Sequence, residues 1–168
     1  ISFAHQLDRA FPFNIQEISD SMAALNKEAA EVMRENGIRC GTDVTGFGLM
    51  GHLAEMVVQS KVTAEITTGN IPLFRDVLMF AQQDLISGAV ERNREFASKF
   101  ISFDADIGPD WQAVLFDPQT SGGILMAVPE KEADSVLVLL KEKGISPASI
   151  IGRIKEKSDG HIIVRSSR

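Results

Sequence analysis

The segment that most constrains the fold is residues 41–53, where a strand pattern gives way to a helix pattern within a few positions. A single carboxylate, Asp43, lies between two threonines, and Gly46 and Gly48 follow it closely. From Leu49 onward, apolar residues recur at helical spacing. The segment therefore predicts a strand that ends in a tight turn and continues as a helix, with an acidic side chain at the turn.

A second glycine turn occupies residues 117–123. Its Gly122 lets a backbone approach a ligand closely, and Thr120 and Ser121 supply hydroxyl groups. The continuous apolar run at residues 124–128 predicts a central strand buried on both faces. The turn therefore either contributes to a ligand site or serves only as a tight connection into that strand.

The rest of the chain alternates between helical and strand periodicity, which is typical of an α+β domain with a mixed sheet. We expect helices, with Leu25 and Phe96 facing inward, at residues 19–36, from Gly46 to about 60, after Pro72, at 91–100 and at 130–144. We expect strands at residues 38–42, 62–68, 149–156 and 161–165, the last two joined as a hairpin through residues 158–160. Residues 1–18 are expected to be a connecting segment and residues 19–168 a single domain.

Composition and charge exclude several classes of protein. A chain of 168 residues can build a real core, and no apolar run approaches the length of a membrane span. The formal net charge of −6, with no basic cluster, argues against a nucleic-acid partner. The one cysteine, Cys40, fits a reducing compartment, so we expect a cytoplasmic protein and interpret Cys40 as a small buried side chain. An acidic protein that handles an anionic ligand needs a metal ion between them.

Asp43 is the leading candidate for such a metal. Mg²⁺ usually binds through one or two carboxylates plus substrate phosphates, and the free N–H groups at a helix start attract the same phosphates. The alternative is that Asp43 or Thr45 merely caps the helix. His52, about one turn into that helix, either faces the site or is a hydrogen-bonded structural residue or an exposed one.

Both turns resemble the signature motifs of the selenophosphate synthetases, or selenide, water dikinases. The first resemblance runs through residues 42–48 and on to 51–53, and the second covers residues 117–123. A shorter similarity lies at Ile151, Gly152 and Arg153. Together these motifs cover most of the chain, which is similar to the C-terminal domain of that family.

The resemblance implies a fold, a reaction and a set of ligands. The fold would be a three-layer α/β/α arrangement with a mixed sheet, partly ferredoxin-like, as in the C-terminal domain of the aminoimidazole ribonucleotide synthetase superfamily. The reaction would convert ATP, selenide and water to selenophosphate, AMP and phosphate, with Mg²⁺ required. The family's metal-binding aspartate matches Asp43. From the same motifs we expect phosphate or inter-domain contacts from Thr45, Gly46, Thr120, Ser121 and Gly122.

The resemblance also implies that part of the enzyme lies outside this chain. The catalytic N-terminal ATP-binding domain has no counterpart here, so we assign no catalytic residue and expect this chain alone to be inactive. The full-length protein is expected to be a homodimer. The chain departs from the family at residues 87–93, where Gly88, Arg92 and Asn93 are kept but Ala89 and Val90 replace a glycine and a threonine. A non-catalytic binding module and another small-molecule kinase of the superfamily therefore stay open.

Overall fold

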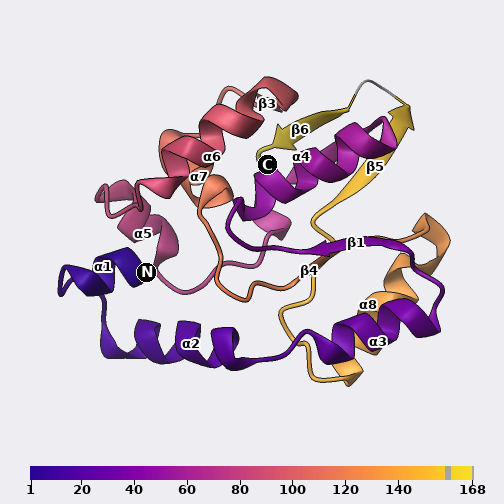
Figure 1. Cartoon of the computed structure of the whole chain (residues 1–168), viewed down its shortest axis with the longest axis horizontal. Helices are drawn as coiled ribbons and strands as arrows, with labels where there is room; N and C mark the ends of the chain where they lie inside the picture. The colour runs from indigo at the N-terminus through magenta and orange to yellow at the C-terminus, as the bar shows by residue number, and fades with distance from the viewer. Residues whose placement is uncertain (158–159, 168) are drawn as a thin grey trace.

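The computed structural model describes residues 1–157 and 160–167, and within them six strands form two sheets (Figure 1). A two-stranded antiparallel sheet pairs β1 (Cys40–Asp43) with β4 (Ile124–Ala127). A four-stranded sheet has the order β3-β6-β2-β5, comprising β2 (Val62–Thr67), β3 (Ile101–Phe103), β5 (Gly152–Lys157) and β6 (His161–Arg165). It is mixed, because β2 runs antiparallel to β5 and parallel to β6, and β6 runs parallel to β3.

The helices lie on both sides of the β1–β4 pair. In Figure 1 this pair lies between α4 and the α3–α8 pair. The α-helices are α1 (Ser2–Gln6), α2 (Pro12–Ala23), α3 (Lys27–Glu35), α4 (Gly48–Ser60), α5 (Val77–Gln82), α6 (Ala89–Ala97), α7 (Pro109–Phe116) and α8 (Ala133–Glu142). Short 3₁₀ turns occur at Thr68–Asn70, Ser98–Phe100 and Glu130–Glu132.

Two hydrophobic clusters hold these layers together. The larger one packs α4, α6 and α7 against one face of the four-stranded sheet, with Met50, Val57, Ile66, Phe116 and Ile162 among its buried side chains. The smaller one joins α3 to α8 and to β4 through Ala29, Val32, Ile38, Val136 and Leu140. The α+β class with a mixed sheet, predicted from the sequence, is therefore confirmed.

The most strongly periodic segments were predicted well. The helix after Gly46 is α4, the strand at 62–68 is β2, and the strand at 38–42 is β1. Gly37 and Gly144 have positive φ angles of 66° and 88°, directly after α3 and α8. Because glycine adopts this conformation without a steric penalty, both helices end where the sequence indicates.

The single helix predicted at residues 19–36 is wrong, because the chain forms α2 and α3 instead. Ala24 is extended, with φ −69° and ψ 135°, so the helix breaks there. Pro12 begins α2 at its first position, which a proline suits. Leu25 lies in the break and is 77% exposed, so its predicted inward position is also wrong.

Two other helix predictions need correction. No helix starts at Pro72; α5 begins at Val77, after Asp76 with a left-handed φ of 63°. The Asn14 side chain donates to the Arg75 carbonyl oxygen and to the Asp76 carboxylate, which holds this segment outside a helix. Phe96 is 45% exposed, because α6 turns Val90, Asn93 and Ala97 inward.

The strand order also differs from the prediction in two places. β4 is only partly buried, because within the described residues it pairs with β1 alone and is not a central strand. β5 and β6 do not form a hairpin, because β2 lies between them and pairs with both. Residues 158–159 of the predicted turn lie outside the described residues. Cys40 is exposed rather than buried, since it lies at the start of β1 in the narrow sheet.

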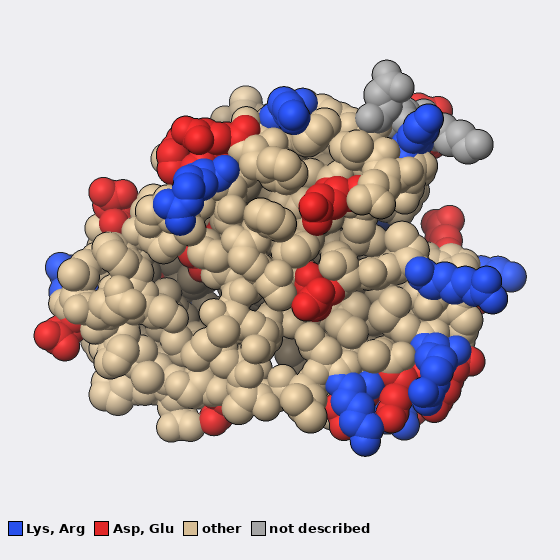
Figure 2. Space-filling view, in the orientation of Figure 1, with Lys and Arg blue, Asp and Glu red and all other residues tan. Residues whose placement is uncertain are grey.

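The surface carries mixed charge. On the face shown in Figure 2, Lys and Arg side chains lie among Asp and Glu side chains and form no continuous basic field. Within the described residues, no helix is long and apolar enough to cross a membrane.

Candidate functional site

The two glycine turns lie side by side. Antiparallel pairing of β1 with β4 places Asp43 opposite Ile124. Two backbone hydrogen bonds continue this pairing into the turns: Val44 N donates to Gly123 O over 2.9 Å, and Gln119 N donates to Thr45 O over 3.0 Å. Two segments more than seventy residues apart in sequence therefore lie side by side.

Glycine is required at the contact between the turns. A Cβ atom on Gly122 would lie 2.2 Å from the Val44 carbonyl oxygen. Gly48 has a φ of 68°, and a Cβ atom there would lie 2.8 Å from the Asp117 carbonyl oxygen. The sequence interpretation assigned Gly122 to the approach of a ligand. In the structure its lack of a side chain also lets one turn pack on the other, and the ligand role of Gly122 stays a prediction.

Asp43 is exposed at the end of β1. The N-cap of α4 is Phe47, and no side-chain hydrogen bond caps this helix, so the alternative that Asp43 or Thr45 caps it is wrong. Among the residues that the structure describes, no hydrogen bond or ion pair engages the Asp43 carboxylate. An exposed, unpaired carboxylate beside a helix start is available to a cation.

The Thr45 side chain is held by His52, which decides between the alternatives given above for that histidine. The Thr45 Oγ1 atom lies 3.0 Å from the His52 Nε2 atom, and His52 is buried. The other ring nitrogen, Nδ1, lies 3.8 Å from a carboxylate oxygen of Glu55. His52 is thus a hydrogen-bonded structural residue that fixes the Thr45 side chain at the turn.

Two asparagines that the sequence interpretation did not single out as site residues hold the turns in place. Asn93, from α6, donates its side-chain amide to the carbonyl oxygens of Gly46 and Phe116, both over 2.9 Å. Asn26, before α3, donates to the Gly122 carbonyl oxygen over 2.8 Å. The sequence could have indicated the buried position of Asn93, because this residue lies at helical spacing with the apolar residues that α6 buries. Nothing comparable marked Asn26.

The second turn presents its hydroxyl groups outward. Thr120 and Ser121 are exposed, and Ser121 has a left-handed φ of 49°. At the start of this turn, burial raises the pKa of Asp117, and a hydrogen bond from the Gln119 side chain opposes the rise. The surface thus combines the exposed Asp43 carboxylate with the hydroxyl groups of Thr120 and Ser121.

This donor set suits a cation–phosphate ligand but is incomplete for a metal by itself. In residues 1–157 and 160–167, no group of three or more His, Cys, Asp or Glu side chains is arranged to hold a metal ion. Mg²⁺ binds six oxygen ligands and commonly takes them from one or two carboxylates, water and substrate phosphates. The Asp43 carboxylate is of the type that could take one of those places, and the described residues hold no acidic cluster that would supply the rest.

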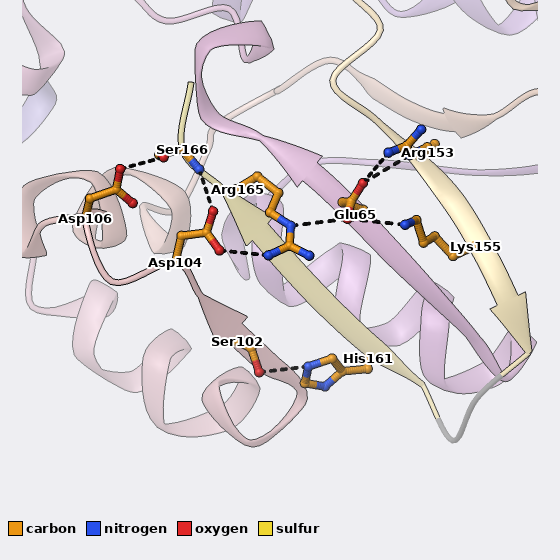
Figure 3. A network of polar contacts seen from close by, with 9 residues as sticks. All are labelled: Glu65, Ser102, Asp104, Asp106, Arg153, Lys155, His161, Arg165 and Ser166. Carbon is orange, nitrogen blue, oxygen red and sulfur yellow. Dashed lines mark hydrogen bonds and ion pairs between the residues drawn. The ribbon is translucent and has the colours of Figure 1, made fainter. Parts of the chain in front are cut away.

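A separate polar network occupies the open face of the four-stranded sheet (Figure 3). Glu65 on β2 accepts hydrogen bonds from Arg153 over 2.8 Å and from Arg165 over 3.2 Å, and Lys155 lies 3.5 Å away. The hydrogen bond from Arg153, followed by the contacts with Arg165 and Lys155, lowers the pKa of Glu65 to about 2. Arg165 also donates to Asp104 over 2.9 Å. Arg153, part of the third sequence similarity, therefore serves to pair β5 with β2.

Comparisons with known proteins agree with this architecture. The family of AIR synthase related proteins matches, through its C-terminal domain, residues 5–165. The chain is 40% identical over 149 residues to the selenide, water dikinase of Pelobacter propionicus, covering 89% of this chain and 43% of that protein. It is 42% identical over 146 residues to the enzyme of the same name from Caldanaerobacter subterraneus, covering 86% and 42%.

The structural comparison points to the same fold. The hydrogenase maturation protein HypE superposes with a TM-score of 0.55 at 20% identity, covering 86% of this chain and 39% of that one. A structure of HypE in complex with ATP gives 0.54. The chain spans less than half the length of the curated relatives it matches, and the resemblance to the selenophosphate synthetases is confirmed. This chain belongs to the family of AIR synthase related proteins and corresponds to its C-terminal domain.

Proposed function

We propose that the chain is the C-terminal part of a selenide, water dikinase, in which Asp43 helps to hold a Mg²⁺ ion bound to ATP. The overall reaction converts ATP, selenide and water to selenophosphate, AMP and phosphate. One observation carries the proposal: both motif turns lie side by side and present an exposed Asp43 carboxylate, which is unpaired among the described residues. The names of the relatives at 40–42% identity support the reaction, and the ATP complex of HypE supports the nucleotide.

The chain's own residues would bind and orient. Asp43 would hold the metal, which when bound neutralises charge on the phosphates, the main requirement of phosphoryl transfer. Thr45 and the backbone of Gly46 would contact phosphate oxygens or the other half of the enzyme. The hydroxyl groups of Thr120 and Ser121 and the backbone of Gly122 would do the same from the second turn. His52 and Asn93 would keep the first turn in place while the ligand binds.

The remaining catalytic groups would come from a preceding ATP-binding domain. We propose that residues 1–18 connect that domain to the domain at 19–168, and that this chain alone is inactive. The full-length protein would be a cytoplasmic homodimer with ATP and selenide as its substrates. The length of the relatives supports a further domain, because more than half of each lies beyond the matched region.

The decisive experiment is Asp43→Asn in the full-length protein, assayed for selenide-dependent ATP consumption. Loss of activity, accompanied by a higher Mg²⁺ requirement for nucleotide binding, is expected because the amide cannot supply the negative charge. Asp134→Asn, which changes an exposed aspartate on α8, is the matched control and should leave both quantities unaltered. Near wild-type turnover of Asp43→Asn would exclude the metal role.

A second candidate is a binding module that has lost catalysis, and one observation favours it. Val90, which replaces the family's threonine, is 1% exposed in the core, so the altered segment offers no hydroxyl group there. Nucleotide binding by the full-length protein without selenide-dependent turnover would support this candidate. Turnover with an acceptor other than selenide would instead indicate another small-molecule kinase of the superfamily.

A further inference from the structure

Two aromatic rings at the first turn are exposed. Phe47, the N-cap residue of α4, is 48% exposed, and Phe96 on α6 is 45% exposed. Their rings stack with centroids 5.8 Å apart at an interplanar angle of 24°. Stacking of this kind leaves a joint apolar surface facing outward rather than two separate side chains.

The ring pair is built into the framework of the site. The Phe47 ring also contacts the buried His52 ring, at 5.6 Å between centroids. Gly51 must lack a side chain for this arrangement, because a Cβ atom there would lie 2.6 Å from the Phe47 Cβ atom. On α6, Phe96 follows Asn93 by one turn, and Asn93 holds the carbonyl oxygen of Gly46. The rings are thus oriented by the same contacts that position the turn.

A second exposed aromatic pair, within the part of the chain that the structure describes, has a different environment. Phe11 and Phe13 also stack, at 5.4 Å, but the Arg75 guanidinium lies over the Phe13 ring at 4.7 Å. That pair therefore has a cationic partner within the chain. Among the described residues, no cation–π contact covers Phe47 or Phe96.

We propose that Phe47 and Phe96 form the docking surface for the preceding domain of the full-length protein, which would place an uncharged, apolar side chain on the two rings. The proposal rests on the proposed function, in which the metal needs ligands from beyond this chain. The preceding domain, which would bind ATP, must bring the ATP phosphates and their metal to the exposed Asp43 carboxylate. Phe47 is four residues away, no more than about 14 Å of extended chain, so the approaching surface would also cover the rings.

The proposal is tested by photocrosslinking in the full-length protein. p-Benzoylphenylalanine replaces Phe96, and the products are mapped by mass spectrometry with and without Mg²⁺ and ATP. The control places the same probe at Val138, a 53% exposed residue on the outer side of α8. We expect crosslinks from position 96 to the preceding domain of the same chain, and none to that domain from position 138.

Several results would overturn the proposal. Crosslinks from position 96 only to a second copy, or only within residues 1–168, would show that the rings have a different occupant or none. If the benzophenone variant does not fold, Phe96→Cys combined with Cys40→Ser and a maleimide-linked diazirine gives the same readout. The crosslink does not depend on turnover. A protein that crosslinks as expected but consumes no ATP with selenide would therefore contradict the proposed function and leave the docking surface standing.

Discussion

Asn93 donates its side-chain amide to the Gly46 carbonyl oxygen over 2.9 Å, across 47 residues of sequence. The same amide donates to Phe116 O, at the end of the helix that leads into the second turn. One buried side chain therefore fixes the starting points of both turns. This role explains why Asn93 matters structurally even though the segment before it departs from the family pattern.

Replacing Asn93 with alanine should destabilise the chain by about 2 kcal/mol, because two hydrogen bonds are lost and two carbonyl oxygens lose a partner in a buried environment. Urea unfolding followed by circular dichroism measures the change. Arg92→Ala, at the exposed neighbouring position, should cost much less. Equal stability of the two variants would show that water replaces the amide without penalty.

Gly122→Ala should disrupt the contact between the turns, because its Cβ atom would lie 2.2 Å from the Val44 carbonyl oxygen. Overpacking of this kind typically costs about 1–3 kcal/mol. The adjacent Gly123→Ala is a matched control, since nothing described lies within 4 Å of its Cβ position. In the unfolding assay, the first variant should lose stability and the second should not. A similar loss in both would point to backbone strain rather than to the packing of one turn on the other.

Thr45→Val removes the hydroxyl group that lies 3.0 Å from His52 Nε2 while keeping the side-chain shape. It should leave a ring nitrogen of the buried His52 without its partner, lowering stability by about 1 kcal/mol. Thr45→Ser keeps the hydroxyl group and should stay within a few tenths of a kcal/mol of the wild type. Thermal unfolding of the two variants distinguishes them, and an equal effect would mean that the methyl group matters more than the hydrogen bond.

Local structure could be predicted from the sequence where a single periodicity dominates. α4 and β2 were identified because their apolar residues follow helical and alternating spacing without interruption. The break between α2 and α3 was missed because Ala24 and Leu25 fit a helical pattern locally. A tertiary contact lies at this break: the Asn26 side-chain amide donates to the Gly122 carbonyl oxygen, 96 residues away.

The candidate site likewise depends partly on local sequence and partly on tertiary contacts. Its polar residues could be predicted from the motifs, but their association depends on the pairing of β1 with β4, which no local signal specifies. The order of the terminal strands β5 and β6 also depends on tertiary contacts. Their short connection favours a hairpin, yet β2 inserts between them because Ala64 and Ile66 complete the core on one face while Glu65 binds the arginines on the other.

The contact of Glu65 with Arg153 and Arg165 predicts a pH dependence of stability. The pKa of Glu65 is lowered to about 2 in the folded chain, from an ordinary value of 4.5. Its ionised form is therefore favoured by folding, so its contribution to stability is fully present above pH 4.5 and is lost as the pH falls towards 2.

Glu65→Gln should be less stable than the wild type at pH 7, and the difference should shrink steadily below pH 4.5. Glu156→Gln, on the same sheet but exposed, provides the control. Urea unfolding midpoints of both proteins, measured from pH 7 to pH 2.5, test this prediction. A constant stability difference across that range would show that the contact between Glu65 and the arginines does not depend on the charge of Glu65.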